Sequence, residues 1–454
     1  MEVFFCELGE EDKSVAFFPE SGRFFKTNGS GKMLIDHIAS GGDYDTLPGC
    51  IQMSKGEYGA YCGTIEGYSK RSEEQTVESC SCNCGKKRLD RLVIHVSNDC
   101  NLRCTYCYAA GGAYGSHRSI VSLDMVEKAL DRFYGHFDEI LNIQIFGGEP
   151  LFNMPAIRFI CEYTEKKFEE RGVRTSLGIV TNGTLINDEF ISLVEKYHMN
   201  VTVSYDGNRK VNDITRPFVG GRGSTEFILT KAQKMYEKTG QPTTIEVTYT
   251  QHHIEQNVEI MDILNDLHEL FPKTSVHLVP VSGKKTDPFT IKDLTVFADS
   301  VDKLFDPKIN KNNLTYSLMQ RIITGISNHT KGSAHICNAG VGTLSVSTKG
   351  DVYPCFMFTD EEDLKLGNIE DEHLFESPRF REKLDRLHNF SNRSKNEECS
   401  HCFMRNLCNG CLGLNASHKG ETFEMNQDIC DMYRAMAKRA IVQCVNSEVM
   451  AEVS

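Results

Sequence analysis

Residues 100–107 read Cys-Asn-Leu-Arg-Cys-Thr-Tyr-Cys, and they follow the apolar, β-branched run at 92–96. Such a run is typical of a buried parallel strand, at whose carboxyl end ligands bind. Cys100, Cys104 and Cys107 thus form C-x3-C-x2-C on one tight loop. Three thiolates can hold three irons of a [4Fe–4S] cluster, which normally takes four cysteines, so one iron is left open. Structural zinc with a distant His as the fourth ligand is the alternative.

The run at 92–96 is the first of several strand-like segments that alternate with helical patterns. Ser122 is placed to cap one helix, and Asn153 precedes Pro155 at the start of another, which Gly172 ends. Alternation at this spacing predicts an α/β fold with a parallel sheet or a partial barrel of six units, fewer than a full eight-fold barrel. The predicted strands are residues 92–96, 143–146, 177–181, 201–204, 245–249 and 276–279, and further helices are expected at 188–197, 227–236 and 254–271.

The second strand ends in Phe146-Gly-Gly-Glu-Pro-Leu-Phe152. Two glycines allow a ligand to approach the backbone closely, and Glu149 can accept hydrogen bonds from an ammonium group. Taken alone, the two glycines read more simply as a tight turn.

The N-terminal segment differs from this pattern. Short β-type runs at 3–8, 15–19 and 23–27 precede a helix that Asn28 can cap, which predicts a small α+β module. A polar stretch follows, with Cys80, Cys82 and Cys84 as a possible redox relay, a source of a cluster ligand, or simply a mobile linker.

The C-terminal third carries a second set of cysteines. They read Cys337-x12-Gly350-x4-Cys355, then Cys399-x2-Cys402-x5-Cys408-x2-Cys411, and finally Cys430. The region has little regular apolar pattern, so metal crosslinks are its expected core. A C-x2-C…C-x2-C arrangement could also bind zinc.

Composition limits the classes of function. The chain has 454 residues and 18 cysteines, and 63 acidic against 50 basic side chains give a net charge of −13. Excess negative charge disfavours a mainly electrostatic partner such as nucleic acid or an anionic membrane. The sequence shows no signal peptide and no apolar run near 18 residues, so we expect a cytoplasmic protein whose clustered thiols bind metal rather than form disulfides.

The cysteine loop and the Gly-Gly-Glu-Pro stretch, in this order, resemble the radical SAM superfamily. The resemblance implies a partial (β/α)6 barrel of the radical SAM type and a cluster on Cys100, Cys104 and Cys107 whose open iron chelates S-adenosylmethionine (SAM). An electron from this cluster would cleave SAM to a 5′-deoxyadenosyl radical. Arg216 would contact the SAM carboxylate, although a surface loop arginine is the alternative reading. The SAM-binding residues implied are Tyr106, Gly147, Gly148, Glu149, Asn182, Ser204 and Arg216.

The C-terminal cysteines resemble the SPASM extension of radical SAM enzymes, which binds two auxiliary [4Fe–4S] clusters and would bring the total to three. This chain has two residues rather than three before Cys411. The family pairing implies an auxiliary cluster I with an open iron and a fully ligated auxiliary cluster II. Their ligands would be Cys337, Cys355 and Cys411 for the first, and Cys399, Cys402, Cys408 and Cys430 for the second.

The N-terminal module resembles the winged-helix-like leader-recognition element of ribosomal peptide maturases; a plain capping domain is the alternative. Together these parts resemble thioether-forming maturases of sactipeptides and ranthipeptides, of the six-cysteine-peptide or freyrasin type. The resemblance implies Cys-to-carbon crosslinks in a leader-bearing precursor peptide, and a flavodoxin- or ferredoxin-type electron donor. A sulfatase-type maturase that makes formylglycine, a C–C crosslinking maturase and a non-enzymatic iron–sulfur electron carrier are the alternatives.

We therefore predict the following division of the chain: a leader-recognition domain at 1–75, a linker at 76–90, the radical SAM core at 91–305, a connecting segment at 306–336, the SPASM domain at 337–435 and a C-terminal helix or tail at 436–454.

Overall fold

The computed structural model describes residues 1–9, 12–70, 86–329, 332–419 and 422–446. Its centre is a nine-stranded sheet in the spatial order β11-β10-β9-β8-β7-β5-β12-β13-β14. The first six of these strands run parallel to one another, as their apolar, β-branched sequences predict. They are β5 (Arg91–Ser97), β7 (Asn142–Gly147), β8 (Ser176–Thr181), β9 (Asn200–Ser204), β10 (Thr244–Tyr249) and β11 (Ser275–Pro280), and each contains a predicted strand.

Helices connect these strands, and their ends follow the predicted capping residues. The Ser122 side chain accepts a hydrogen bond from the Met125 N–H, Asn153 accepts from the Ala156 N–H, and Gly172 ends its helix with a positive φ of 70°. The helices are α3 (Leu123–His136), α4 (Met154–Arg171), α5 (Asp188–Tyr197), α6 (Arg209–Thr215), α7 (Thr225–Thr239), α8 (Gln251–Glu255), α9 (Ile260–Leu270) and α10 (Thr295–Phe305).

The helix expected over residues 254–271 is two helices, α8 and α9. Asn257 between them has a φ of 53°, in the left-handed region that ends a right-handed helix. Glu259 then starts α9 with a capping box to Asp262. The apolar periodicity continues across the break and therefore conceals it in the sequence.

The C-terminal part extends the same sheet. Strand β12 (Thr343–Val346) pairs parallel with β5, and β13 (Asp351–Tyr353) and β14 (Gly367–Asn368) continue antiparallel. The predicted boundary at residue 435 lies inside one continuous helix, α15. The buried side chains of this helix run from Ile429 to Cys444, so the helix does not end at the boundary. The other elements are α11 (Ser317–Ser327), α12 (Pro378–Ser391), α13 (Glu397–Ser400), α14 (Leu412–Asn415), β15 (Ala416–Lys419), β16 (Thr422–Met425) and α15 (Gln427–Asn446).

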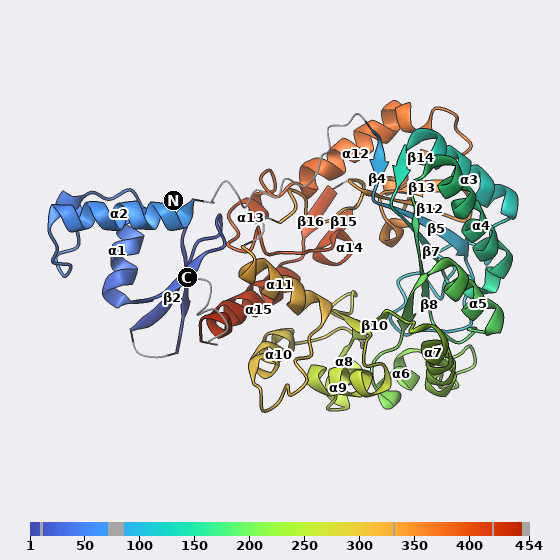
Figure 1. The fold of residues 1–454 in the computed structure, drawn as a ribbon, viewed down its shortest axis with the longest axis horizontal. Helices are drawn as coiled ribbons and strands as arrows, with labels where there is room; N and C mark the ends of the chain where they lie inside the picture. The colour runs from blue at the N-terminus through green and yellow to red at the C-terminus, as the bar shows by residue number, and fades with distance from the viewer. Residues whose placement is uncertain (10–11, 71–85, 330–331, 420–421, 447–454) are drawn as a thin grey trace.

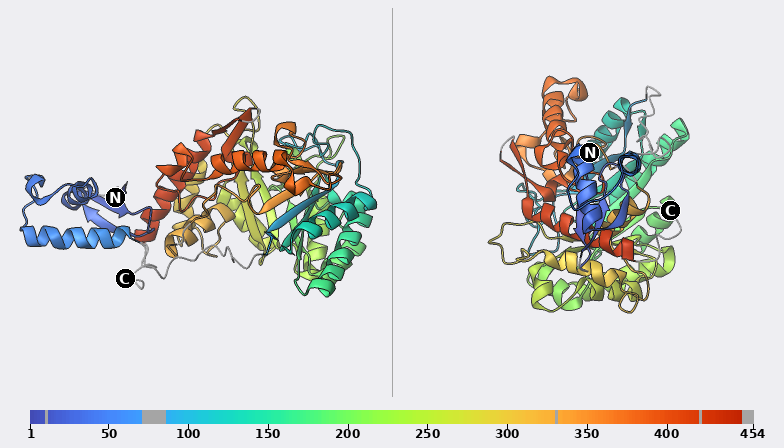
Figure 2. Two further views of the ribbon diagram at one scale, coloured as in Figure 1. Left: turned by 90° about the horizontal axis from the view of Figure 1, so that it is seen from above. Right: turned by 90° about the vertical axis from the view of Figure 1, so that its left-hand side faces the viewer.

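The N-terminal module projects from one end of the molecule, beside α15 (Figures 1 and 2). Asn28 caps its first helix as predicted, and a separate small core that includes Phe18, Leu34 and Ile35 holds it together. Its elements are β1 (Phe4–Glu7), β2 (Lys13–Phe17), β3 (Phe24–Asn28), α1 (Gly29–Ala39) and α2 (Lys55–Ser69).

Strand β1 fixes this module to the C-terminal part. The rings of Phe4 and Phe403 stack with centroids 4.0 Å apart, and Arg405 pairs with Glu2 and Glu20. In the three-stranded sheet, β1 and β3 are the two outer strands, so β3 is the outer strand on the side away from β1.

Two short strands pair the segment before β5 with the segment between α3 and β7. Strand β4 (Arg88–Leu89), which ends the predicted linker, pairs with β6 (Glu139–Ile140). Cys80, Cys82 and Cys84 lie outside the described residues. Within the described parts of the chain, none of the helices has both the length and the apolar character needed to cross a bilayer.

Candidate active site and cysteine centres

The loop that carries Cys100, Cys104 and Cys107 leaves the carboxyl end of β5. The three thiols lie near one another. Burial raises the pKa of Cys104 to about 12; Arg216 lowers it, and the neighbouring thiols Cys107 and Cys100 raise it. The Cys104 thiol therefore stays protonated until a metal displaces its proton.

These thiols line a cavity of about 330 Å³. Several predicted residues from other strand ends share its wall, and so does one cysteine of the C-terminal part, Cys411. The structure thus brings together Cys100, Cys104, Tyr106, Cys107, Gly147, Gly148, Asn182, Ser204, Arg216 and Cys411.

Gly147 and Gly148 are glycines because the chain is crowded behind them. A Cβ at Gly147 would lie 2.3 Å from the Ser97 carbonyl oxygen, and one at Gly148 would lie 2.5 Å from that of Asp99. Gly147 also has a φ of +145°. The pair lets the end of β7 pack on the start of the cysteine loop while its other side faces the cavity.

Glu149 does not line the cavity; its carboxylate is fully buried in the wall behind it. It accepts hydrogen bonds from the Leu151 N–H, the Thr181 hydroxyl and the Asn182 N–H. Burial raises its pKa to about 7, although these hydrogen bonds lower it. Glu149 therefore fixes the position of Asn182, whose side-chain amide lies 3.6 Å from the Cys100 sulfur.

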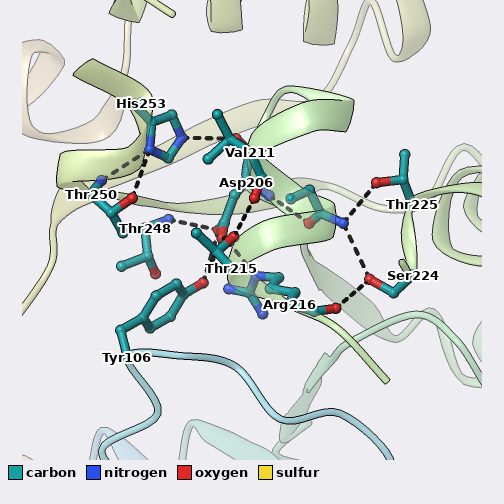
Figure 3. Close-up of polar contacts among 11 residues, drawn as sticks. Tyr106, Asp206, Val211, Thr215, Arg216, Ser224, Thr225, Thr248, Thr250 and His253 are labelled. Atoms are coloured by element: carbon teal, nitrogen blue, oxygen red, sulfur yellow. Dashed lines mark hydrogen bonds and ion pairs between the residues drawn. The ribbon is translucent and has the colours of Figure 1, made fainter. Parts of the chain in front are cut away.

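Arg216 is buried at the cavity wall, and the alternative of a surface loop position does not match the structure. Its Nε donates to Asp206 at 3.0 Å. Asp206, two residues after Ser204, is fully buried. Its carboxylate also accepts a hydrogen bond from the Tyr106 hydroxyl (Figure 3).

The C-terminal cysteines form two groups. In the first, Cys399, Cys402, Cys408 and Cys430 line, with neighbouring side chains, one cavity of only about 30 Å³. Burial raises the pKa of Cys399 to about 12, and the other three thiols raise it as well.

The second group is Cys337, Cys355 and Cys411. Burial raises the pKa of Cys355 to about 12, and the thiols of Cys411 and Cys337 contribute in the same direction. Cys411 also lines the large cavity, so this group adjoins the space that the β5 loop encloses. In the described parts of the chain, no three or more His, Cys, Asp or Glu side chains converge on one point in the way that a single metal ion requires.

Sequence reasoning missed several residues of this cavity. Asp206 lies behind the cavity wall, where it binds Arg216, and its place directly after the buried strand β9 was the available signal. The others come from elements far apart in the sequence, and no local motif marks them. They are Glu246, Thr248, His277, Arg321, Phe356 and Tyr433.

Comparison with known proteins agrees with this geometry. Residues 94–280 match the radical SAM superfamily, and residues 337–403 match SPASM, an iron–sulfur cluster-binding domain. A cysteine-type anaerobic sulfatase-maturating enzyme of Clostridium perfringens is 23% identical over 384 residues, which cover 79% of this chain and 98% of that protein. The antilisterial bacteriocin subtilosin biosynthesis protein AlbA of Bacillus subtilis is 27% identical over 333 residues, 71% of this chain and 67% of that protein.

Among solved structures, native anSMEcpe with bound AdoMet and Cp18Cys peptide superposes with a TM-score of 0.63 at 22% identity, covering 79% of this chain and 98% of that one. The expected fold class is therefore confirmed. The chain has the radical SAM α/β fold joined to a SPASM iron–sulfur cluster-binding domain.

Proposed function

We propose that this protein is a radical SAM enzyme that installs Cys-to-carbon thioether crosslinks in a ribosomally made, leader-bearing precursor peptide. One observation carries the proposal: Cys411 of the C-terminal part and the three cysteines of the β5 loop line one cavity. A peptide sulfur held at one end would lie close to a radical formed at the other. Proximity and orientation are what a protein contributes to such cofactor chemistry.

The cysteine groups fit three iron–sulfur clusters. We assign Cys100, Cys104 and Cys107 to a cluster with an open iron, because their loop faces the cavity. The four thiols around the small cavity would ligate auxiliary cluster II completely, which matches the four cysteines that a [4Fe–4S] cluster takes. Cys337, Cys355 and Cys411 would hold auxiliary cluster I and leave one iron for the peptide thiolate. Together with SAM, the β5-loop cluster supplies a hydrogen-abstracting radical when it is bound.

The cavity wall also fits SAM. Arg216 binds Asp206 through Nε, and its two terminal nitrogens are left for a carboxylate. Ser204 lies on the same wall, and Gly147 and Gly148 bring backbone to the cavity on another side. We assign Tyr106, Gly147, Gly148, Asn182, Ser204 and Arg216 to SAM, with Glu149 acting through the backbone of Asn182.

An extended substrate has room beside this site. A second cavity, of about 600 Å³, lies between the segment after β11 and the start of α15, and it shares Val281, Ser282 and Leu414 with the first. The relatives agree with a peptide substrate, because one acts in subtilosin biosynthesis and the fold neighbour binds AdoMet and the Cp18Cys peptide.

We assign leader recognition to residues 1–75. Strand β3 is the outer strand of the three-stranded sheet on the side away from the β1 contact, so it can receive a peptide as an added strand. A flavodoxin- or ferredoxin-type protein would supply electrons.

A sulfatase-type protein maturase is the second candidate, and the match to 98% of the Clostridium perfringens enzyme favours it. That match covers 79% of this chain. The two candidates differ in the product: a thioether joins Cys sulfur to carbon, whereas a formylglycine residue retains no sulfur.

The test uses anaerobically reconstituted protein with SAM, dithionite and a Cys-containing precursor peptide. We expect 5′-deoxyadenosine, a peptide that has lost two hydrogens per crosslink, and a crosslinked Cys that resists alkylation. About twelve irons per chain are expected for three clusters. Absence of 5′-deoxyadenosine from protein with its full iron content, or an aldehyde product, would contradict the proposal.

A further inference from the structure

The segment that follows β9 places a buried acidic side chain between the cysteine loop and the predicted SAM carboxylate site. We propose that Asp206 is a positioning residue that orients Arg216 and the loop of Cys104 and Cys107 toward the carboxylate of SAM. This inference rests on the proposed function, because it presumes SAM in the cavity of about 330 Å³.

Asp206 is the centre of a hydrogen-bonded network that joins four parts of the fold (Figure 3). Its side chain is fully buried. The Tyr106 hydroxyl lies 2.9 and 2.8 Å from its two oxygens, and the Thr215 hydroxyl lies 2.6 Å from one of them. The Thr248 N–H of β10 and the Arg216 Nε donate to the same carboxylate, at 3.2 and 3.0 Å. A buried carboxylate with this many donors has one defined orientation.

The backbone of Asp206 is fixed as firmly as its side chain. Nδ1 of His253 accepts the Thr250 N–H, so Nε2 carries the proton and donates to the Asp206 carbonyl at 3.0 Å. The Asp206 N–H donates to Asn212. The carboxylate therefore cannot turn away from Arg216 without breaking several buried hydrogen bonds.

The contact with Asp206 determines which edge of Arg216 faces the cavity. Because Nε is used, the two terminal nitrogens remain as a fork for a bidentate carboxylate. Burial lowers the pKa of Arg216, but the charge of Asp206 raises it, and the result lies well above the ordinary value. The guanidinium thus stays charged although only 7% of its residue surface is exposed.

The same carboxylate holds the cysteine loop through Tyr106, which lies between Cys104 and Cys107. The Arg216 guanidinium carbon lies 5.4 Å from the centre of the Tyr106 ring. Backbone hydrogen bonds from Thr105 to Thr215 and from Arg103 to Pro217 also join the loop to this segment. Those bonds do not involve the Asp206 side chain, so its substitution should spare the local fold.

The test compares wild-type protein, Asp206→Asn and Asp213→Asn as full chains with anaerobically reconstituted clusters. Asn has the size of Asp but lacks the charge, and it presents an N–H₂ group to Arg216 or Tyr106. Asp213 is the matched control: it lies seven residues along, accepts the Thr225 N–H and does not line the cavity.

Equilibrium dialysis with SAM gives the dissociation constant, and electron paramagnetic resonance of the reduced protein reports the change that SAM causes in the cluster signal. We expect SAM to bind Asp206→Asn about 10-fold more weakly, the scale of one lost charge-assisted hydrogen bond. Iron content and melting temperature should remain close to those of the wild type. Asp213→Asn should bind SAM like the wild type.

A double-mutant cycle separates positioning from general structural damage. If Asp206 acts through Arg216, Asp206→Asn should weaken SAM binding little further in an Arg216→Lys background. The inference would be overturned if the two substitutions weakened SAM binding independently, so that their fold-changes multiplied. It would also be overturned if Asp206→Asn bound SAM within about 2-fold of the wild type.

If Asp206→Asn melts at a lower temperature, Thr215→Val carries the test, since it removes one contact with the carboxylate and keeps the side-chain shape. We then expect SAM binding about 3-fold weaker, and unchanged binding would overturn the inference. Wild-type protein with full iron that binds no SAM would instead contradict the proposed function.

Discussion

The two cysteine groups of the C-terminal part differ in what surrounds them. Cys399, Cys402, Cys408 and Cys430 enclose about 30 Å³, and the space between them has no room for a substrate. Cys337, Cys355 and Cys411 are three thiols, one of which also lines the cavity of about 330 Å³ shared with the β5 loop. A closed set of four thiols suits a structural or electron-transfer cluster, whereas an open set of three suits a ligand-binding one.

The same contrast sets the β5 loop apart from the closed group. The loop offers three thiols with polar residues opposite them, among them Arg216 and Ser204. Four thiols would complete the ligand set of a [4Fe–4S] cluster, whereas three thiols beside a cavity would leave one iron open to a ligand.

Cys100→Ala should have the largest effect. We expect 5′-deoxyadenosine formation to fall below detection and the iron content to fall by about four per chain, because one open-cluster ligand is lost. Cys161→Ala is the control, since Cys161 is fully buried in α4 and distant in sequence from the cysteine motifs. Anaerobic turnover with SAM and dithionite, together with iron analysis, measures both. Normal SAM cleavage by Cys100→Ala would contradict the distinction.

Cys411→Ala should separate SAM cleavage from crosslinking. With the cavity-facing thiol of auxiliary cluster I removed, crosslinked peptide should fall more than about 100-fold while 5′-deoxyadenosine still forms. Cys408→Ala, in the closed group, should lower iron content and the melting temperature together, because a cluster bound there would crosslink this part of the fold. Mass spectrometry of the peptide and chromatography of the nucleoside give the two yields. If Cys411→Ala formed crosslinks at the wild-type rate, the group of Cys337, Cys355 and Cys411 would not be needed for crosslinking.

Gly148→Ala should destabilise the site by about 1–3 kcal/mol, because the new methyl group overlaps the Asp99 carbonyl oxygen and the Gly112 Cα. Gly135→Ala in α3 is the control: a Cβ there meets nothing within 4 Å, and it should stabilise by about 0.5–1 kcal/mol. Urea unfolding followed by circular dichroism compares them. Equal stability of the two variants would show that the turn at Gly148 tolerates a side chain.

His95 contacts the segment between β13 and β14, and its substitution gives the smallest effect. It is buried on β5, and its Nε2 lies 3.2 Å from the Thr359 hydroxyl. Burial lowers its pKa to about 3, so the unfolded chain takes up a proton first as the pH falls. Neutral, buried His95 therefore contributes to the free energy of unfolding at neutral pH, and this contribution is lost progressively as the pH falls through 6.5 toward 3. The loss amounts to about 1.4 kcal/mol between pH 7.5 and 5.5.

His95→Phe should remove that pH dependence while keeping the ring. The measurement is the free energy of unfolding of both proteins at pH 7.5 and 5.5. The same decrease in both would show that His95 does not titrate between the folded and unfolded states.

The sequence predicts the repeating part of this fold well. Each of the six apolar runs became a parallel strand, and Asn28, Ser122 and Asn153 cap helices because capping depends on a few neighbouring residues. The break before α9 and the passage of α15 through residue 435 were missed, since a left-handed Asn257 and continued burial interrupt no periodicity.

The candidate site was predictable where motifs are local. Spacing alone identified the loop cysteines and the Gly-Gly turn, which the structure places on one cavity. It did not show that Glu149 turns into the wall, that Asp206 links Tyr106 to Arg216, or that Cys411 reaches the same cavity. These features depend on contacts between residues tens to hundreds of positions apart. Such contacts form only when the chain is folded, so no local sequence pattern marks them.

We expect the open thiol group, Cys337, Cys355 and Cys411, to receive a peptide sulfur on the cluster that it would hold. The most direct measurement is electron paramagnetic resonance of the reduced Cys100→Ala protein, in which signals of the auxiliary clusters remain, with the precursor peptide and with its Cys→Ser variant. We predict that the Cys peptide alone shifts one of the two auxiliary signals. Spectra that are identical with and without the Cys peptide would contradict the claim.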